Sequence, residues 1–235
     1  MAGLIWPLVF FIIVAFLASA AMFRQQREQR RQETLQAIAN EWGYDFVAEA
    51  RELPERETGF YFLSQSSSHR TQNIISNTNG HLSVSLFDHS YKANNDDIEG
   101  SYDRFQTIVR FHSPLLQLPF VSIRPKSIRN RFQNSPIIRY VNDPLFNANY
   151  LVFAASSAPI EPAKDRVTTD IRAWLLKHDS RWTVEAEGSY LYAYCDLLLV
   201  DGRGLKAFAD EAREIFDLFV SGTASEDGWV RADGW

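Results

Sequence analysis

The sequence predicts an α+β protein in which an N-terminal transmembrane helix precedes a mostly antiparallel β-sheet domain with covering helices. Three observations support this prediction. An uncharged apolar run stands near the N-terminus, apolar and polar residues alternate through the middle of the chain, and apolar residues return at helical spacing in the last third. The 235 residues are enough for one domain with a proper core beside the helix.

Residues 1–23 are predicted to form the transmembrane anchor. Residues 4–23 include no charged side chain, and a helix needs about 20 apolar residues to cross a bilayer core. Ala18-Ser19-Ala20 resembles the cleavage site of a signal peptide, so cleavage is the competing interpretation. A retained anchor is favoured because no basic residue precedes Arg24 and because a signal peptide has only about 7–15 apolar residues.

Basic residues predict which side of the membrane the domain faces. Arg24, Arg27, Arg30 and Arg31 follow the apolar run, whereas the three residues before the run include no basic side chain. Because positive residues stay on the cytoplasmic side, the soluble domain is predicted to face the cytoplasm, with the exported side as the alternative.

Residues 24–43 are predicted to form a juxtamembrane helix that continues out of the membrane. Its first half is polar all round and is interpreted as a solvated stalk. Its second half has one apolar face, and Gly43 is predicted to end the helix. The apolar face comprises Leu35, Ile38, Ala39 and Trp42.

Residues 44–221 are predicted to form the α+β domain, and the first part of it has the alternation of β-strands. The predicted strands are residues 60–63, 72–78, 82–88, 105–111, 120–124 and 150–154. Asn79-Gly80 indicates a hairpin turn, since both residues tolerate positive φ. Residues 94–100 are predicted to be an exposed loop, and residues 124–132 a short helix that begins near Pro125.

The second part of the domain combines helices with a further hairpin. Residues 182–187 and 190–195 are predicted to pair around a turn at Gly188-Ser189. Residues 159–177 are predicted to form one helix that buries Ile160, Val167, Ile171, Trp174 and Leu175. A last helix over residues 204–220 is predicted to bury Leu205, Phe208, Ala209, Ala212, Ile215, Phe216 and Phe219. Residues 222–235 are predicted to be a flexible C-terminal tail.

Charge and cysteine content limit the partners of the chain. It has 24 basic and 29 acidic side chains, so a nucleic-acid-binding surface is not predicted. The single cysteine, Cys195, excludes an internal disulfide and fits a reducing compartment. Because Asp196 stands beside it, we interpret Cys195 as buried and unreactive.

Several segments resemble an uncharacterised family of bacterial membrane-anchored proteins. They are Asn73-Ile74-Ile75, Phe87-Asp88-His89-Ser90-Tyr91, Leu118-Pro119-Phe120 with Arg124-Pro125, and Trp182-Thr183-Val184-Glu185 with Tyr194. The similarity spans residues 37–194, which is most of the predicted domain. His89 stands where the family pattern has tyrosine, and the segment that begins at Leu118 is one residue shorter. The family has no established activity, so the resemblance implies a coherent domain and no particular function.

Asp88 and His89 are the most suggestive pair for chemistry, since a carboxylate can orient an imidazole that acts as a base. Adjacent residues of a strand point to opposite faces, however, so a packing role for His89 is favoured. No spacing of histidine and cysteine residues is typical of a metal site, and Gly202-Arg203-Gly204 lacks the pattern of a phosphate-binding loop. No catalytic, cofactor-binding or metal-binding residue is therefore assigned.

The sequence favours a non-catalytic interaction or scaffold domain held at the membrane. The alternative is a membrane-tethered, hydrolase-like enzyme with a site assembled from dispersed residues around Asp88 and His89, with His112 as a further candidate. The tail repeats Asp-Gly-Trp at Trp229 and Trp235, and exposed tryptophans suit docking into a protein partner. A tail that folds back onto the domain is the competing interpretation.

Overall fold

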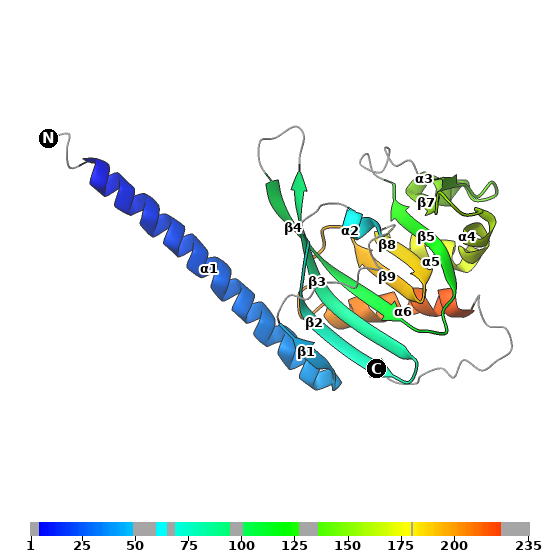
Figure 1. Ribbon diagram of the computed structural model, residues 1–235, viewed down its shortest axis with the longest axis horizontal. Coiled ribbons are helices and arrows are strands. Elements are labelled where there is room, and N and C mark those ends of the chain that lie inside the picture. The colour runs from blue at the N-terminus through cyan, green and yellow to red at the C-terminus, as the bar shows by residue number, and fades with distance from the viewer. Residues whose placement is uncertain are drawn as a thin grey trace.

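A long N-terminal helix projects from a β-sheet domain in the computed structural model (Figure 1). The structure describes residues 5–48, 60–64, 69–94, 101–126, 136–179 and 181–221. In this part of the chain, nine strands form one sheet in the order β1-β2-β3-β4-β9-β8-β5-β7-β6. Each pairing between neighbouring strands is antiparallel, which confirms the predicted mostly antiparallel sheet with helices.

Among the described elements, five strands, β2 to β6, follow one another in the first half of the domain, and most of the helices lie in the second half. The strands are β1 (Asp45–Val47), β2 (His69–Asn79), β3 (Leu82–Asn94), β4 (Ser101–His112), β5 (Leu118–Pro125), β6 (Ile137–Ile138), β7 (Tyr150–Ala154), β8 (Trp182–Gly188) and β9 (Tyr190–Cys195). The helices are α1 (Ile5–Trp42), α2 (Tyr61–Ser64), α3 (Pro144–Asn149), α4 (Glu161–Arg166), α5 (Thr169–Lys177) and α6 (Leu205–Ser221).

Alternating side chains give the sheet two apolar faces of different size. On β3, Leu86 lies in the main core, whereas its neighbour Phe87 lies in a smaller aromatic cluster on the opposite face. The main core is closed by α5, α6 and the C-terminal part of α1, and the ring of Phe216 on α6 stacks on that of Phe111 on β4. The smaller cluster is closed by Phe62 of α2. Helices therefore cover both faces of the sheet.

The hairpin and the helix predicted near the end of the domain are confirmed. β8 and β9 pair around Gly188-Ser189, and Gly188 has the positive φ (57°) that such a turn requires. α6 begins one residue after the predicted start, and all seven side chains predicted to be buried on it are buried. These elements depend on contacts between sequence neighbours and on one continuous apolar face.

The single helix predicted over residues 159–177 is two helices, α4 and α5. Thr168 has an extended backbone, which stops α4, and its side chain accepts a hydrogen bond from the Ile171 N–H, which caps α5. Val167 and Ile171 are buried as predicted, but Ile160 is 40 % exposed. The apolar spacing continues across the break, so periodicity alone did not reveal it.

Two local predictions in the first part of the domain are wrong. Residues 60–63, predicted as a strand, lead into the short helix α2, because the backbone N–H groups of Tyr61 and Phe62 donate to the buried Glu185 carboxylate. The predicted hairpin between β2 and β3 is present, but its turn is Gly80-His81 and not Asn79-Gly80, since Asn79 pairs with Leu82. Only the first of the two turn residues, Gly80, has a positive φ.

The N-terminal helix α1 is continuous from Ile5 to Trp42 and ends at Gly43, whose φ of 70° fits the predicted C′ position. Among the residues that the structure describes, none of the helices has the length and apolarity of a membrane span. The predicted span, residues 4–23, lies partly outside this description, which omits residue 4 and the side chains of residues 5–9 and 11–13. Also outside it lie residues 95–100 of the predicted loop, residues 127–132 of the predicted short helix, and the tail, residues 222–235.

Candidate functional site

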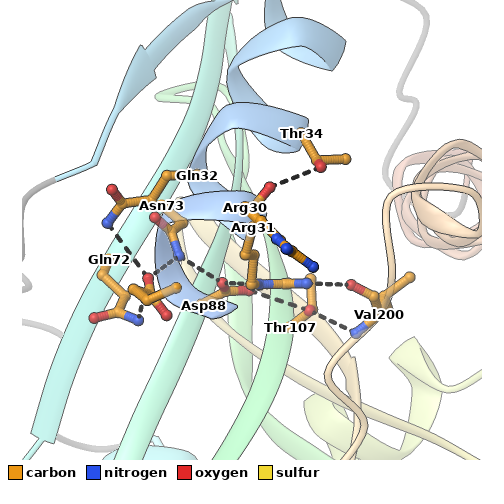
Figure 2. Close-up of polar contacts among 10 residues, drawn as sticks. Arg30, Arg31, Gln32, Thr34, Gln72, Asn73, Asp88, Thr107 and Val200 are labelled. Carbon is orange, nitrogen blue, oxygen red and sulfur yellow. Dashed lines mark hydrogen bonds and ion pairs between the residues drawn. The ribbon is translucent and has the colours of Figure 1, made fainter. Parts of the chain in front are cut away.

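A buried ion pair joins α1 to the middle of the sheet. The guanidinium of Arg31 donates from Nε to Oδ2 of Asp88 and from Nη2 to Oδ1, each at 2.6 Å (Figure 2). The Asp88 side chain is 3 % exposed and that of Arg31 is 15 % exposed. Two parallel hydrogen bonds between a guanidinium and a carboxylate fix the orientation of the two groups as well as adding stability. This pair therefore sets how α1 lies against β3.

The same ion pair connects to the loop that precedes α6. Nη1 of Arg31 donates to the Val200 carbonyl at 2.9 Å, and the Val200 N–H donates to Oγ1 of Thr107 at 3.0 Å (Figure 2). Thr107 in turn donates to Oδ1 of Asp88 at 3.4 Å. Side chains from α1, β3 and β4 and the backbone of the β9–α6 loop therefore meet at one carboxylate.

The site includes a second carboxylate, that of Glu28, which lies on α1 about one helical turn before Arg31. Its Oε1 accepts from Nδ2 of Asn73 at 3.0 Å and from Nε2 of Gln72 at 3.2 Å (Figure 2). Asn73 Nδ2 also donates to Oδ2 of Asp88 at 2.9 Å, so its amide bridges the two carboxylates. We name Glu28, Arg31, Asn73, Asp88 and Thr107 the α1 clamp.

An irregularity in β2 places Asn73 in the α1 clamp. The pairing of β2 with β3 shifts register between Gln72 and Ile75, and Asn73 at the shift has a positive φ of 55°. Asparagine tolerates this left-handed conformation better than most residues, and a bulge redirects the side chain that it carries. The strand thereby turns the Asn73 amide toward α1.

Apolar packing continues the contact below the α1 clamp. Leu35 and Ala39 of α1 are buried in the main core. The loop before α6 approaches the helix so closely that a Cβ added at Gly202 would lie 2.5 Å from Cγ2 of Thr34. Glycine is therefore required there by close approach, and α1 is held by both polar and apolar contacts from Glu28 to Trp42.

A second buried polar network surrounds Glu185 on the other face of the sheet. Oε1 accepts from the Tyr61 N–H at 2.9 Å and from the Ser122 hydroxyl at 2.8 Å, and Oε2 accepts from the Tyr194 hydroxyl at 3.0 Å. The carboxylate is fully buried, and Nη2 of Arg124 lies 3.8 Å from Oε1. We name Glu185, Ser122, Arg124 and Tyr194 the Glu185 network.

Arg124 ties α2 to this network. Its Nε donates to the Ser122 hydroxyl at 2.8 Å, and its guanidinium lies over the Tyr61 ring, 3.5 Å from the centroid. Burial and the nearby Glu185 charge raise the pKa of Tyr194, so its hydroxyl stays protonated and remains a donor to Glu185. Glu185 and Arg124 thus hold α2 on the sheet, and the Ser122 and Tyr194 hydroxyls bind these two residues.

The candidate pair for chemistry, Asp88 and His89, does not meet. Asp88 belongs to the α1 clamp, whereas His89 lies on the opposite face, where its ring packs edge-on against Phe62 and stacks with His69. Its Nε2 is 3.2 Å from Nδ1 of His69. His112 stacks on Tyr190 at the end of β4, away from this pair. The prediction that His89 has a packing role is in agreement with these contacts.

Burial lowers the pKa of His89 to about 3, with a smaller contribution from the nearby charge of His69. The folded-state pKa is therefore below the unfolded-state value of about 6.5, and the unfolded chain binds the extra proton first. We expect the contribution of His89 to the free energy of unfolding to be fully present above pH ~6.5. Between pH ~6.5 and ~3, the free energy of unfolding should fall by roughly 1.4 kcal/mol for each pH unit.

Urea-induced unfolding at a series of pH values checks this expectation. The matched control is His89→Phe, which keeps an aromatic ring beside Phe62 and Tyr91 but cannot titrate. As the pH falls from 7 to 4, the free energy of unfolding of the wild-type protein should decrease relative to that of His89→Phe. A difference that stays constant over that range would contradict a buried neutral histidine.

The other residues considered from the sequence, Cys195 and the glycines before α6, have structural roles. Cys195 is buried, as predicted, and burial raises the pKa of its thiol to about 12, which disfavours the reactive thiolate. The Gly204 N–H donates to Oδ1 of Asp201 at 2.8 Å, so the glycines before α6 form a turn. In the described part of the chain, no three histidine, cysteine or acidic side chains converge as a metal site would require.

Sequence reasoning missed Glu28 and Arg31, which it assigned to a solvated stalk. Both residues contact the sheet, so this half of the juxtamembrane helix is not uniformly solvated. A signal was present, because Glu28, Arg31, Leu35 and Ile38 repeat at intervals of three and four on one helix face. When polar residues continue the apolar face of a helix in this way, they indicate that the helix also makes polar contacts with the domain beyond the apolar part of that face.

No protein-family model and no curated protein matches the chain. Among solved structures, the chain is similar to the mycobacterial trehalose monomycolate transport factor A, TtfA, with a TM-score of 0.55. The two share 12 % sequence identity, and the match covers 83 % of this chain and 93 % of that chain. At this identity the likeness shows a shared fold, which extends over nearly the whole of TtfA.

Proposed function

We propose that this chain is a single-pass membrane protein whose α+β domain is a non-catalytic interaction domain on the cytoplasmic side. The observation that carries this proposal is the geometry of α1. One uninterrupted helix of 38 residues begins in the apolar run and continues through the α1 clamp to Trp42. At 1.5 Å per residue it is about 57 Å long, so the domain would be held at a defined distance and orientation from the bilayer.

The described side chains of the apolar run support the membrane as a partner. Large apolar side chains project from α1 into the surroundings; they are Phe10, Val14, Phe16, Leu17, Met22 and Phe23. Ser19, the one hydroxyl in this stretch, donates to the Ala15 carbonyl at 2.8 Å and so needs no water. In water such an exposed apolar surface is unfavourable, whereas in a bilayer it is the expected one.

The use of the buried charged groups supports a non-catalytic role. Asp88 is engaged by Arg31, Asn73 and Thr107, and Glu185 is engaged by the groups that hold α2. A general acid or base must reach a substrate, and these carboxylates are covered by the helices that they bind. The similar protein TtfA is named a transport factor, and an accessory role of that general kind is what we propose here.

The tail supplies the proposed contact with a protein partner. Trp229 and Trp235 stand in repeated Asp-Gly-Trp segments, and tryptophan is enriched among the residues that dominate binding energy at interfaces. Co-purification after detergent extraction would compare the full chain with Trp229→Ser/Trp235→Ser. Loss of a co-purifying protein from the double variant is the expected result, and an unchanged set would contradict a docking role for the tail.

Membrane attachment and orientation are tested with the full chain and two C-terminal reporters. After alkaline carbonate extraction of membranes, the full chain should stay in the membrane fraction, whereas a chain without residues 2–23 should not. A fluorescent reporter fused after Trp235 should be active, and an alkaline phosphatase fused there should be inactive. Extraction of the full chain by carbonate would overturn the anchor, and the reverse reporter pattern would overturn the orientation.

A further inference from the structure

A cavity of about 620 Å³ opens on the surface between the start of β5, helix α4 and the β8–β9 turn. It lies apart from both the α1 clamp and the Glu185 network. Pockets of 300–1,000 Å³ are typical of small-molecule sites, in which apolar walls surround a few polar groups. The cavity has this composition.

Apolar side chains form most of the walls. Leu116 and Leu118 come from the segment that leads into β5, and both are almost fully buried by the domain behind them. Pro119 and Pro162 contribute rigid rings from the two sides of the opening. Gly188 lies at the β8–β9 turn, where a Cβ would meet no atom within 4 Å, so the turn leaves the space open.

One charged group in the lining, Arg166, forms no ion pair with any residue that the structure describes. Arg166 is half-buried, and in the described part of the chain its guanidinium has neither an ion pair nor a side-chain hydrogen bond. Burial lowers its pKa below the ordinary value. Arg172, six residues later, shows the usual arrangement, because its Nε donates to Oδ2 of Asp143 at 2.8 Å.

We propose that this cavity binds an amphipathic monoanion, namely a carboxylate on a short apolar chain. The Arg166 guanidinium would hold the carboxylate, which matches its geometry, and the walls formed by Leu116, Leu118 and Pro119 would hold the chain. A monoanion is favoured over a dianion because Arg166 is the one basic residue among the described residues of the lining and because Asp165 contributes a negative charge at the exposed rim. The proposal does not depend on membrane attachment.

Isothermal titration calorimetry with the full chain in phosphatidylcholine nanodiscs tests the proposal. Sodium hexanoate is the probe, and acetate and 1-hexanol supply its head and tail separately. Hexanoate should bind with saturable heat, and each half alone should bind at least about tenfold more weakly, since a hydrogen-bonded charge is worth a factor of that order. Partition of the probe into lipid is the same for every variant, so differences between variants report on the cavity.

Three variants separate charge from shape. Arg166→Gln should weaken hexanoate binding about tenfold or more without lowering stability, because it removes a cation that forms no ion pair with the described residues. Gln117→Trp, at an exposed position in the lining, should block the cavity and abolish binding while Arg166 remains. Asp165→Asn should leave binding unchanged or tighter.

Two results would overturn the proposal. One is a saturable heat for hexanoate that is the same in the wild-type protein and in Arg166→Gln, or that is absent from both. The other is binding of an N-acetylated dipeptide with a C-terminal leucine at least about tenfold more tightly than hexanoate, which would assign the cavity to the carboxyl terminus of a peptide.

Discussion

Asp88→Ala is expected to lower the free energy of unfolding by about 3–5 kcal/mol, because it leaves the Arg31 guanidinium in the α1 clamp without its carboxylate. Arg31 would lose two hydrogen bonds of 2.6 Å, and Asn73 and Thr107 would each lose an acceptor. Urea-induced unfolding of the full chain in a mild non-ionic detergent, followed by tryptophan fluorescence, measures the change.

The double variant Arg31→Met/Asp88→Leu is the matched control. It removes both charges, so no uncompensated cation remains, and most of the lost stability should return. Hydrogen exchange adds a local measurement, since the amides of residues 24–42 should lose protection in Asp88→Ala while those of α6 keep theirs. Equal destabilisation of the single and double variants would show that charge pairing is not what holds α1.

Glu185→Ala, on the other face of the sheet, should lower the free energy of unfolding by a similar amount, about 3–5 kcal/mol. Its carboxylate is fully buried and is the common acceptor for the Tyr61 N–H, the Ser122 hydroxyl and the Tyr194 hydroxyl. Removing it leaves these donors without their acceptor and takes away the carboxylate that lies 3.8 Å from the Arg124 guanidinium. The short helix α2 also loses the bonds that position its first turn. The same unfolding measurement gives the loss of stability.

Glu187→Ala tests whether this cost is specific to a buried carboxylate. Glu187 lies on the same strand two residues later and is exposed, so its removal should change stability by no more than about 0.5 kcal/mol. Ser122→Ala, which removes one of the donors, should lie between the two. A loss below about 1 kcal/mol for Glu185→Ala would contradict the Glu185 network as the element that holds α2.

Local sequence patterns predicted the elements that depend on near neighbours. The β8–β9 hairpin follows from Gly188 at a turn that needs positive φ, and α6 follows from an apolar face that repeats every three to four residues. The errors occur where a helix cap or a contact between distant residues determines the local structure. Thr168 caps α5 and so breaks a continuous apolar pattern, and α2 forms because Tyr61 donates to Glu185, which is 124 residues away.

The residues that carry the family resemblance have a common physical role. Asn73 and Asp88 belong to the α1 clamp, and Arg124, Glu185 and Tyr194 belong to the Glu185 network. The sequence identified these positions, but it assigned them no partners. Their partners come from other strands and from α1, and such pairings are not encoded in any local period.

The sequence by itself determined the class of the fold, the apolar run at the N-terminus, and the opposite directions of Asp88 and His89, because alternation and helical spacing are properties of short segments. Only the tertiary structure decided that Arg31 and Glu28 bind the sheet, that helices cover both of its faces, and that Arg166 lines an open cavity. Each of these depends on contacts between segments that are far apart in the sequence, and the partner of a buried charge can lie anywhere in the chain.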